Sequence, residues 1–254
     1  METLVEPFAR YEFRSVVPGV ETLPPRMSQP RHHHREGYAT VVLAGSFTEV
    51  SFAGRMEAEP GDVLLHGRFD CHLDIARSRG PLQILRLPWR SDVLEGRFRV
   101  RDPDALVRLA ELDTELAASQ LRHELQPPPL RERLWIDDLA SALSGDSGFL
   151  LQEWADRRGL RGDVLSRVFR REFGVSAQRF RLESRTRLAW RQVLSSARTL
   201  TEIAFQAGFA DLAHMSRSIH VFTGRPPTAW RANRRHGDGS AQMPSSAESS
   251  RRAH

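Results

Sequence analysis

Arginines occupy matching places in two segments of the second half of the chain, where they could bind DNA. Residues 150–174 and 200–224 each hold a short helical run, an alanine four residues before a glycine, a second helical run with Ser-Arg in its middle, and a closing glycine. A guanidinium can make two hydrogen bonds to guanine or pair with a phosphate. The small alanine allows close helix packing and the glycine allows a tight turn, so the pattern predicts two helix-turn-helix units. A helical bundle with a repeated packing pattern is the alternative.

We expect the second helix of each unit to bury one apolar face and to expose the residues that contact DNA. The buried set is Leu165, Val168, Phe169, Met215, Ile219 and Phe222. The exposed, DNA-contacting set is Arg161, Gly162, Asp163, Ser166, Arg167, Arg170, Leu212, Ala213, His214, Arg217 and His220. A connecting helix of about 19 residues is ~28 Å long, close to one ~34 Å turn of DNA, so both units could enter successive major grooves.

The charge of the chain is divided unevenly between its two halves. All 37 basic residues are arginines. Residues 1–129 hold 16 arginines and 19 acidic residues, a net charge of −3, whereas residues 130–254 hold 21 arginines and 13 acidic residues, a net charge of +8. A basic second half favours a polyanionic partner such as DNA. A solvated, arginine-rich surface would give the same charge.

Strands and helices follow one another along the chain in a way that would position these residues. Short β-branched runs separated by Gly and Pro between residues 38 and 100 predict a small barrel or sandwich. The alternation in residues 71–75 places His72 and Asp74 on one face, which meets solvent or a polar cavity. Cys71 lies on the opposite face, where we expect it in the core.

The rest of the chain is predicted to be helical, apart from a linker and a tail. Residues 102–118 predict one amphipathic helix that packs on the barrel or pairs with a second subunit. The Pro-rich residues 126–129 predict a linker, and residues 236–254 lack large apolar side chains and are expected to be disordered. Further helices are expected at residues 130–143, 149–158, 163–173, 177–195, 200–207, 211–223 and 227–234.

Composition excludes several classes of protein. No apolar run approaches the ~20 residues that a membrane-spanning helix needs, and the first residues lack the pattern of a secretory signal. A single cysteine, Cys71, excludes a disulfide framework and a multi-cysteine zinc site. We therefore expect a soluble cytoplasmic protein.

Residues 150–231 resemble, without a gap, the AraC-type transcriptional regulators. The resemblance implies a seven-helix domain with two helix-turn-helix units that binds asymmetric promoter sites. Arg161 and Gly162 stand where the family usually has Ser-Pro, which removes a helix cap that Asp163 could replace. The matching residues are Ala155, Gly159, Leu160, Leu165, Ser166, Arg167, Phe169, Arg170, Phe173, Gly174, Val175, Ser176, Arg185, Ala189, Ile203, Ala204, Gly208, Phe209, Asp211, Ser216, Arg217, Gly224, Pro227, Trp230 and Arg231.

Residues 30–90 are similar to the cupin barrel that many AraC-type regulators carry. In the cupin metal pattern, His32 and His34 would be the first ligands and His72 the last, but Tyr38 stands where a glutamate is usual. Because that carboxylate ligand is missing, we expect no cofactor, with His32, His34 and His72 as the alternative metal ligands. The histidines would instead line an effector pocket or form a polar loop. The candidate effector-binding residues are His32, His34, His66, Arg68, His72 and Trp89.

Together these observations predict an α+β multidomain protein, with a cupin-like β-barrel followed by an all-α domain that carries two helix-turn-helix units. The expected domains are residues 1–125 for effector sensing and dimerisation, 126–129 as linker, 130–235 for DNA binding, and 236–254 as tail. The predicted function is a sequence-specific transcriptional regulator, not an enzyme, controlled by a small molecule in the barrel. Its partners would be double-stranded promoter DNA, the effector, a second copy of the chain and, for an activator, RNA polymerase, with no membrane. The alternatives are a metal-dependent cupin enzyme fused to a DNA-binding module, and a DNA-coating architectural protein.

Overall fold

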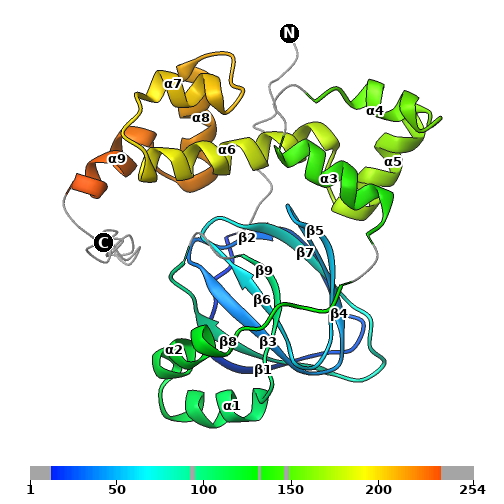
Figure 1. The fold of residues 1–254 in the computed structure, drawn as a ribbon, viewed down its shortest axis with the longest axis vertical. Helices are drawn as coiled ribbons and strands as arrows, with labels where there is room; N and C mark the ends of the chain where they lie inside the picture. Colours follow the sequence, from blue (N-terminus) through cyan, green and yellow to red (C-terminus); the bar gives the residue numbers. More distant parts are fainter. Residues whose placement is uncertain (1–12, 92–94, 131–132, 146–148, 236–254) are drawn as a thin grey trace, which may run out of the picture.

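The computed structural model describes residues 13–91, 95–130, 133–145 and 149–235, in which nine strands precede nine helices (Figure 1). The strands are β1 (Gly19–Leu23), β2 (Ser28–His33), β3 (Tyr38–Ala44), β4 (Phe47–Ser51), β5 (Gly54–Ala58), β6 (Asp62–His66), β7 (Cys71–Ala76), β8 (Leu82–Pro88) and β9 (Gly96–Arg99). The helices are α1 (Pro103–Leu112), α2 (Thr114–Glu124), α3 (Trp135–Gly145), α4 (Leu151–Arg157), α5 (Gly162–Phe173), α6 (Ala177–Ser195), α7 (Leu200–Gln206), α8 (Leu212–Thr223) and α9 (Pro227–Arg235). Over these residues, no helix is both long and apolar enough to cross a membrane.

Two antiparallel sheets form the β domain, defined here as β1–β9 with α1 and α2. One sheet has five strands in the order β1-β8-β3-β6-β9, and the other has four in the order β2-β7-β4-β5. Figure 1 shows the sheets facing each other as an open barrel. The predicted order of an N-terminal β fold followed by helices is confirmed.

In β7, polar side chains face the interior and apolar side chains face outward. Along β7, His72 and Asp74 line the interior between the sheets, whereas Cys71 and Leu73 lie in apolar clusters with helical residues. The period of two in a strand produces this separation. The face that carries His72 is therefore a polar cavity rather than a solvated surface.

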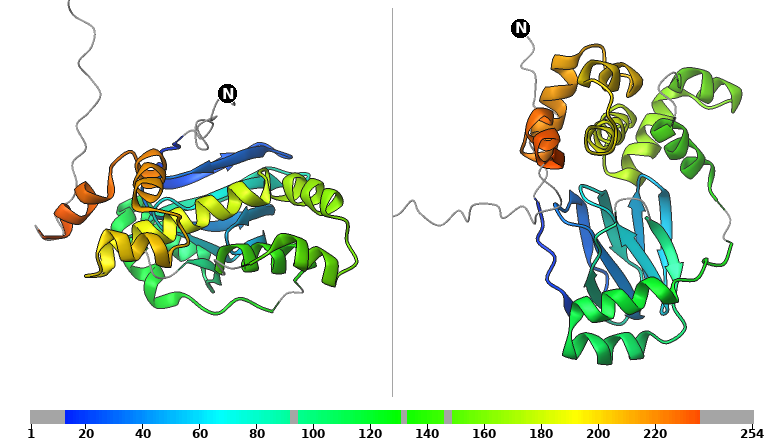
Figure 2. Two further views of the ribbon diagram at one scale, coloured as in Figure 1. Left: turned by 90° about the horizontal axis from the view of Figure 1, so that it is seen from above. Right: turned by 60° about the vertical axis from the view of Figure 1, so that its left-hand side comes forward.

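Helices α1 and α2 cover the outer face of the five-stranded sheet (Figure 2). Leu106 of α1 and Leu121 of α2 are fully buried against residues of that sheet. The prediction of one helix over residues 102–118 is wrong, because the chain breaks at Asp113. Its carboxylate accepts hydrogen bonds from the amides of Glu115 and Leu116 at 2.8 and 3.2 Å, which caps a second helix.

The helical domain, α3–α9, covers the outer face of the four-stranded sheet. Helix α6 runs across this end of the β domain, with α3–α5 to one side of it and α7–α9 to the other (Figure 1). One apolar cluster joins Val50 and Leu73 of the sheet to α3–α6, and another joins Phe69 and Cys71 to α6–α9. The two domains therefore share their hydrophobic cores.

The predicted helical bounds agree with α6 at residues 177–195 and differ most at α3. That helix begins at Trp135 rather than at residue 130, and the side chain of Leu130 is fully exposed. The amide of Leu134 donates to the Asp137 carboxylate at 3.2 Å, a contact typical of the residue just before a helix. Residues 236–254, the predicted disordered tail, lie outside the described residues. The domain bounds stay a prediction.

Candidate DNA-binding surface and buried histidine cluster

The two helix-turn-helix units, α4–α5 (the first unit) and α7–α8 (the second unit), share one turn geometry. The carbonyl oxygens of Ala155 and Ala204 accept hydrogen bonds from the amides five residues ahead, at 3.0 and 2.9 Å. Gly159 and Gly208 have φ angles of 62° and 75°, a region that side chains with a Cβ atom rarely adopt. Both alanines are buried. The repeat seen in the sequence is thus a structural repeat.

The second helix of each unit, α5 or α8, buries the face that the sequence predicts. Of the six residues expected inside, five are fully buried and Val168 is half-buried. In the predicted DNA-contacting set, the exposed residues are Arg161, Asp163, Ser166, Arg167, Arg170, Ala213, Arg217 and His220. The half-buried residues of that set are Gly162, Leu212 and His214. Their contacts with DNA stay a prediction.

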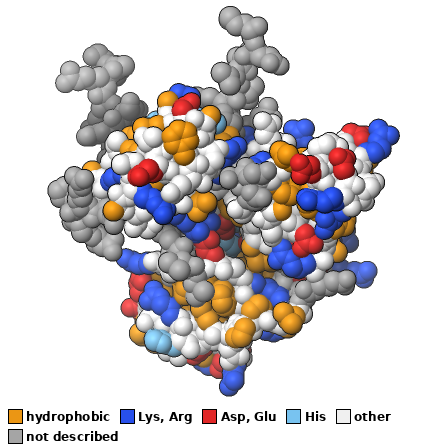
Figure 3. All heavy atoms as spheres, turned by 45° about the horizontal axis from the view of Figure 1, so that its top comes forward, with side chains coloured by type: hydrophobic (Ala, Val, Ile, Leu, Met, Phe, Trp, Pro, Cys, Tyr) orange, Lys and Arg blue, Asp and Glu red, His pale blue; other side chains and the backbone are white. Residues whose placement is uncertain are grey.

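The exposed arginines at these helices differ in whether they pair with a carboxylate. Asp163 pairs with Arg161 at 3.1 Å and with Arg167 at 3.3 Å, so it does not cap α5 as its position suggested. Within the described ranges, Arg170 and Arg217 have no carboxylate partner. Figure 3 shows arginine side chains spread over the helical domain among acidic and apolar ones. Arg170 and Arg217 are therefore the exposed cations readiest to pair with a phosphate or a base.

Four of the predicted effector-binding residues converge between the two sheets. The ring centroid of His72 lies 4.5 Å from that of His32, 5.3 Å from that of His34 and 4.8 Å from that of His66. Cross-strand pairing brings His32 next to His72. Tyr38 Oη lies 3.1 Å from His72 Nε2, at hydrogen-bond distance. We call these four histidines the histidine cluster.

Carboxylates that the sequence did not single out complete this interior. Glu49 of β4 lies opposite Asp74 of β7 in the sheet. Glu49 Oε2 is 3.4 Å from His66 Nε2, and Asp70 Oδ2 is 3.2 Å from His66 Nδ1. Because an ionised carboxylate only accepts, Nδ1–H of His66 donates to Asp70. The other ring nitrogen of His66, Nε2, faces Glu49.

Burial shifts the pKa values of this cluster strongly. Desolvation lowers the pKa of His32 to about 4 and that of His34 to about 3, and it lowers the pKa of His72 well below its ordinary value. Desolvation raises the pKa of Asp74 to about 7. Burial alone would raise the pKa of Asp70, but the guanidinium of Arg187 and the hydrogen bond from His66 lower it overall. At neutral pH the imidazoles of His32, His34 and His72 are uncharged and Asp70 is ionised.

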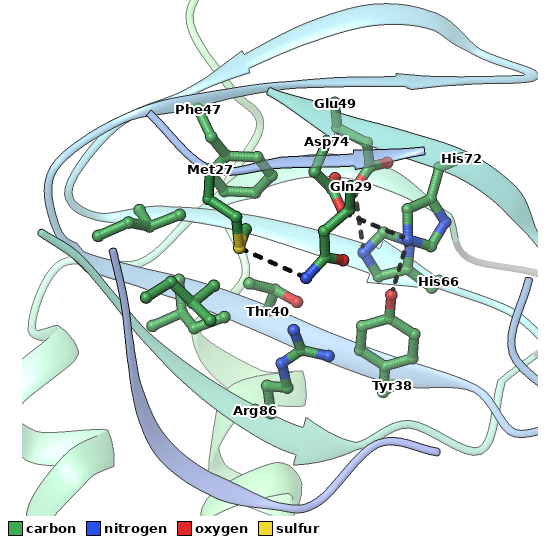
Figure 4. A pocket seen from close by; sticks show the side chains of 13 residues that line it. Met27, Gln29, Tyr38, Thr40, Phe47, Glu49, His66, His72, Asp74 and Arg86 are labelled. Atoms are coloured by element: carbon green, nitrogen blue, oxygen red, sulfur yellow. Dashed lines mark hydrogen bonds and ion pairs between the residues drawn. The ribbon is translucent and has the colours of Figure 1, made fainter. Parts of the chain in front are cut away.

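Two cavities adjoin the cluster. The first, of about 20 Å³, lies between the sheets and is lined by Tyr38, Glu49, His66 and His72, among others (Figure 4). It has room for about one water molecule. The second, of about 360 Å³, lies beside β1 and is lined by Arg14, Arg86 and His34, among others. Its volume is within the range of small-molecule pockets, roughly 300–1,000 Å³.

The other two predicted effector-binding residues, Arg68 and Trp89, lie away from both cavities. The guanidinium of Arg68 lies over the rings of Trp190 and Trp230, at 5.4 and 5.2 Å, between the domains. Trp89 is buried in the apolar core under α1 and α2. The sequence did not show on which side of the sheets the side chains of Arg68 and Trp89 would lie.

Buried ion pairs join the sheet to α6. Arg31 Nε lies 3.0 Å from Glu183 Oε2, and both side chains are almost fully buried. Arg187 Nη1 lies 3.6 Å from Asp70 Oδ1, and Arg187 also pairs with Glu95. Arg187 Nε donates to the carbonyl oxygen of residue 68 at 3.0 Å. Asp70 therefore contacts both the histidine cluster and α6.

Comparison with known families decides what the helical domain is. Residues 154–233 match the family model described as a helix-turn-helix domain, and the match spans both structural repeats. This match identifies residues 154–233 as a helix-turn-helix domain of the AraC type. The chain is thus a DNA-binding transcriptional regulator. No curated protein is similar in sequence to this regulator at a significant level.

Solved structures similar to the regulator include full-length and DNA-binding chains. One is ToxT from Vibrio cholerae with a bound unsaturated fatty acid, at 10% identity over 85% of this chain and 94% of that chain, with a TM-score of 0.39. The C-terminal domain of the response regulator yesN from Fusobacterium nucleatum has 26% identity over 38% and 93%, with a TM-score of 0.34. The DNA-binding domain of AdpA in complex with target DNA has 23% identity over 40% and 93%, with a TM-score of 0.37. Because these TM-scores are below 0.5, the family assignment rests on the matched domain and the two structural repeats instead.

The sequence of the regulator gave little sign that Glu49 and Asp70 would face the histidines. Glu49 lies in the run TEVSF, whose alternation fits a strand with either face inward. Asp70 follows Phe69, which has a φ angle of 56° in the turn before β7. This turn points Phe69 into the helical core and Asp70 into the polar interior. Arg187 was one of several arginines on a predicted helix, with nothing to mark its partner.

Proposed function

We propose that the regulator binds specific promoter sites through α5 and α8, and that a small effector held in the β domain controls this binding. The exposed arginines of both helices support the first part. The length of α6, 19 residues, corresponds to ~28 Å, close to one ~34 Å turn of B-DNA. Two recognition helices at its ends would therefore meet successive major grooves on one side of the duplex.

The attachment of α6 to the β domain carries the second part of the proposal. Glu183 and Arg187 of α6 are buried against Arg31 and Asp70, which belong to the four-stranded sheet and the turn beside it. The other face of that sheet carries His72, which lies near His66 of the five-stranded sheet across the interior. A ligand that changes the sheet must therefore change the contacts of the helix that spaces the two units. An effector acts by its differential affinity for the two resulting states.

The predicted dimer has an exposed apolar surface to support it. Leu112 of α1 is 83% exposed and Leu116 of α2 is 53% exposed, and Figure 2 shows α1 and α2 at the end of the β domain opposite α6. We propose that a second copy of the chain covers these leucines, which leaves both DNA-binding units free. Sedimentation of the L112E/L116E variant as a monomer, with the unaltered chain a dimer, supports this. Monomers for both would contradict it.

Selection of genomic DNA fragments on the purified full chain tests the DNA-binding part. We expect a discrete enriched motif of ~20 base pairs, the length of two major-groove visits. Retention without a motif that vanishes as salt rises would show non-specific phosphate binding instead. A repeat with cell extract present tests whether the effector must be supplied first.

Two substitutions then assign the recognition residues. Arg167→Ala and Arg217→Ala should each weaken binding to the selected site by ~1–3 kcal/mol and relax its sequence preference, if these side chains contact bases. Arg171→Ala is the matched control, because Arg171 is exposed on α5 but lies outside the predicted set and pairs with Glu172. Unchanged binding in both variants would contradict the assignment.

A further inference from the structure

The interior of the β domain combines two nitrogen donors and one oxygen donor around the small cavity. We infer that Glu49, His66 and His72 bind one first-row transition-metal dication, and that this ion is the effector of the regulator. The second clause rests on the proposed function, whereas the first stands on the geometry alone. All three residues are buried, and one ligand atom from each lies within 4.8 Å of the others.

The separation of the ligand atoms fits a shared ion. Two ligands at ~2.0–2.2 Å from a tetrahedral Zn²⁺ lie roughly 3.3–3.6 Å apart. Glu49 Oε2 and His66 Nε2 are 3.4 Å apart, longer than the ~2.7–2.9 Å of a charge-assisted hydrogen bond. The two atoms are thus placed as neighbours on one ion rather than as partners of each other.

Three buried polar atoms of this interior lack a hydrogen bond in the described part of the chain, although one of them, His72 Nδ1, lies 3.9 Å from Asp70 Oδ2. Among the described residues, Glu49 Oε1, His72 Nδ1 and Asp74 Oδ1 are buried without a hydrogen bond. Buried polar groups in proteins are generally paired with protein, water or an ion. A cation beside Glu49 and His72 would satisfy several of these atoms at once.

The hydrogen bond that His66 makes on the side away from Glu49 is typical of a metal-binding histidine. Such a histidine usually donates its second ring N–H to a carboxylate, which fixes the tautomer and the ring. His66 Nδ1 donates to Asp70 at 3.2 Å, and Nε2 faces Glu49. Asp70 is in turn held by Arg187 of α6. One residue therefore separates the ligand His66 from the helix that spaces the DNA-binding units.

The size of the cavity selects the class of ligand. A volume of about 20 Å³ between the sheets accommodates a single ion or water and no organic molecule. Imidazole and carboxylate ligands together suit Zn²⁺ and its first-row neighbours better than Mg²⁺ or Ca²⁺, which prefer all-oxygen sites. Tyr38 stands where the cupin pattern has a glutamate ligand. Glu49 of β4 supplies the carboxylate ligand instead.

Metal titration of the full chain tests the site without reference to DNA. The chain is stripped with a chelator and titrated with Zn²⁺ alone, and with Co²⁺ for its visible absorption. We expect one ion per chain at micromolar concentration or tighter, a tetrahedral Co²⁺ spectrum and a raised Tm. Binding of less than one ion per chain, with no change in Tm, would overturn the inference.

Three variants identify the ligands. Glu49→Gln and His66→Gln should each weaken Zn²⁺ binding by at least tenfold. His34→Gln is the matched control, because His34 is equally buried near His72 but belongs to the alternative group of His32, His34 and His72. It should bind within about twofold of the unaltered chain. Loss of binding in His34→Gln with retention in Glu49→Gln would overturn the assignment, and circular dichroism of the metal-free variants shows that each is folded.

A separate arm tests whether the ion is the effector. Affinity for the selected DNA site is measured for metal-free and Zn²⁺-loaded chains, and we expect a change of at least fivefold. If Zn²⁺ binds stoichiometrically without such a change, the metal site stands and its regulatory role is wrong. If Zn²⁺ does not bind but a cell extract alters DNA affinity, the metal site is wrong and the proposed function stands.

Discussion

The two helix-turn-helix units share a turn but differ in what holds their helices in place. In the second unit, Thr199 and Glu202 form a capping box at α7, and the Asp211 carboxylate caps α8 by accepting from the amide of His214 at 2.6 Å. In the first unit, the residues at the cap positions of α4 and α5 are Leu150 and Arg161, and neither side chain makes a capping bond. Side chains therefore cap the N-termini of both helices in the second unit, and of neither helix in the first.

The β domain supplies polar anchors on the side of the first unit. Arg55 Nη1 pairs with Glu172 Oε2 of α5 at 2.6 Å. The amide of Arg55 donates to Asp137 of α3 at 2.9 Å. On the side of the second unit, aromatic packing dominates, with Phe69 against Trp190 and Trp230. These contacts predict that the first unit depends more on the β domain than the second unit does.

Removing the buried partner of Arg31 should give the largest effect. Glu183→Ala leaves a buried guanidinium without its carboxylate, which costs ~3–5 kcal/mol of folding free energy. Urea denaturation of the full chain, followed by circular dichroism, measures it. A loss below ~1 kcal/mol would show that the pair is not a major anchor.

A double variant separates the charge from the packing. Arg31→Met with Glu183→Leu replaces both charges by apolar side chains and should recover most of the lost stability. Arg31 also lies 5.2 Å from the ring centroids of Phe52 and Phe180, an apolar setting that a methionine suits. No recovery would indicate that the pair holds the domains together by more than charge compensation.

A smaller effect is expected from removing a cap of the second unit. Asp211→Ala removes the carboxylate that accepts from His214 N–H and should cost about 1 kcal/mol, measured by urea denaturation. Asp156→Ala is the control, because Asp156 lies in α4 and caps no helix. Equal losses in the two variants would argue against the importance of the cap.

The smallest effect should be a gain in the first unit. Arg161→Ser places a capping hydroxyl before α5, where none exists, and should add up to about 1 kcal/mol of stability. A rise in the urea midpoint at constant m-value checks this. A decrease would mean that the contact between Arg161 and Asp163 contributes more than a cap would.

Local sequence patterns predicted most of the helical domain. The repeat, the glycine positions and α6 depend on residues close together in the chain, so a single sequence carries their signal. The break at Asp113 was missed because the apolar stripe continues past it, although its carboxylate caps α2. In that case the capping residue, rather than the hydrophobic period, decided the structure.

The contacts that the sequence could not predict join residues that are far apart in the chain. Arg31 and Glu183 are 152 positions apart and meet only because the sheet packs on α6. Glu49 reaches the histidine cluster through its pairing with Asp74 on a neighbouring strand. The sequence brought His32, His34 and His72 together through a resemblance, whereas the structure places Arg68 and Trp89 away from them.

Hydrogen–deuterium exchange of the full chain, compared between the unaltered protein and Glu183→Ala, tests the central claim most directly. If the first unit depends on the β domain, amides in α4 and α5 should exchange at least tenfold faster in the variant, while those in α7 and α8 change little. Equal acceleration in both units, or acceleration confined to α7 and α8, would contradict the claim.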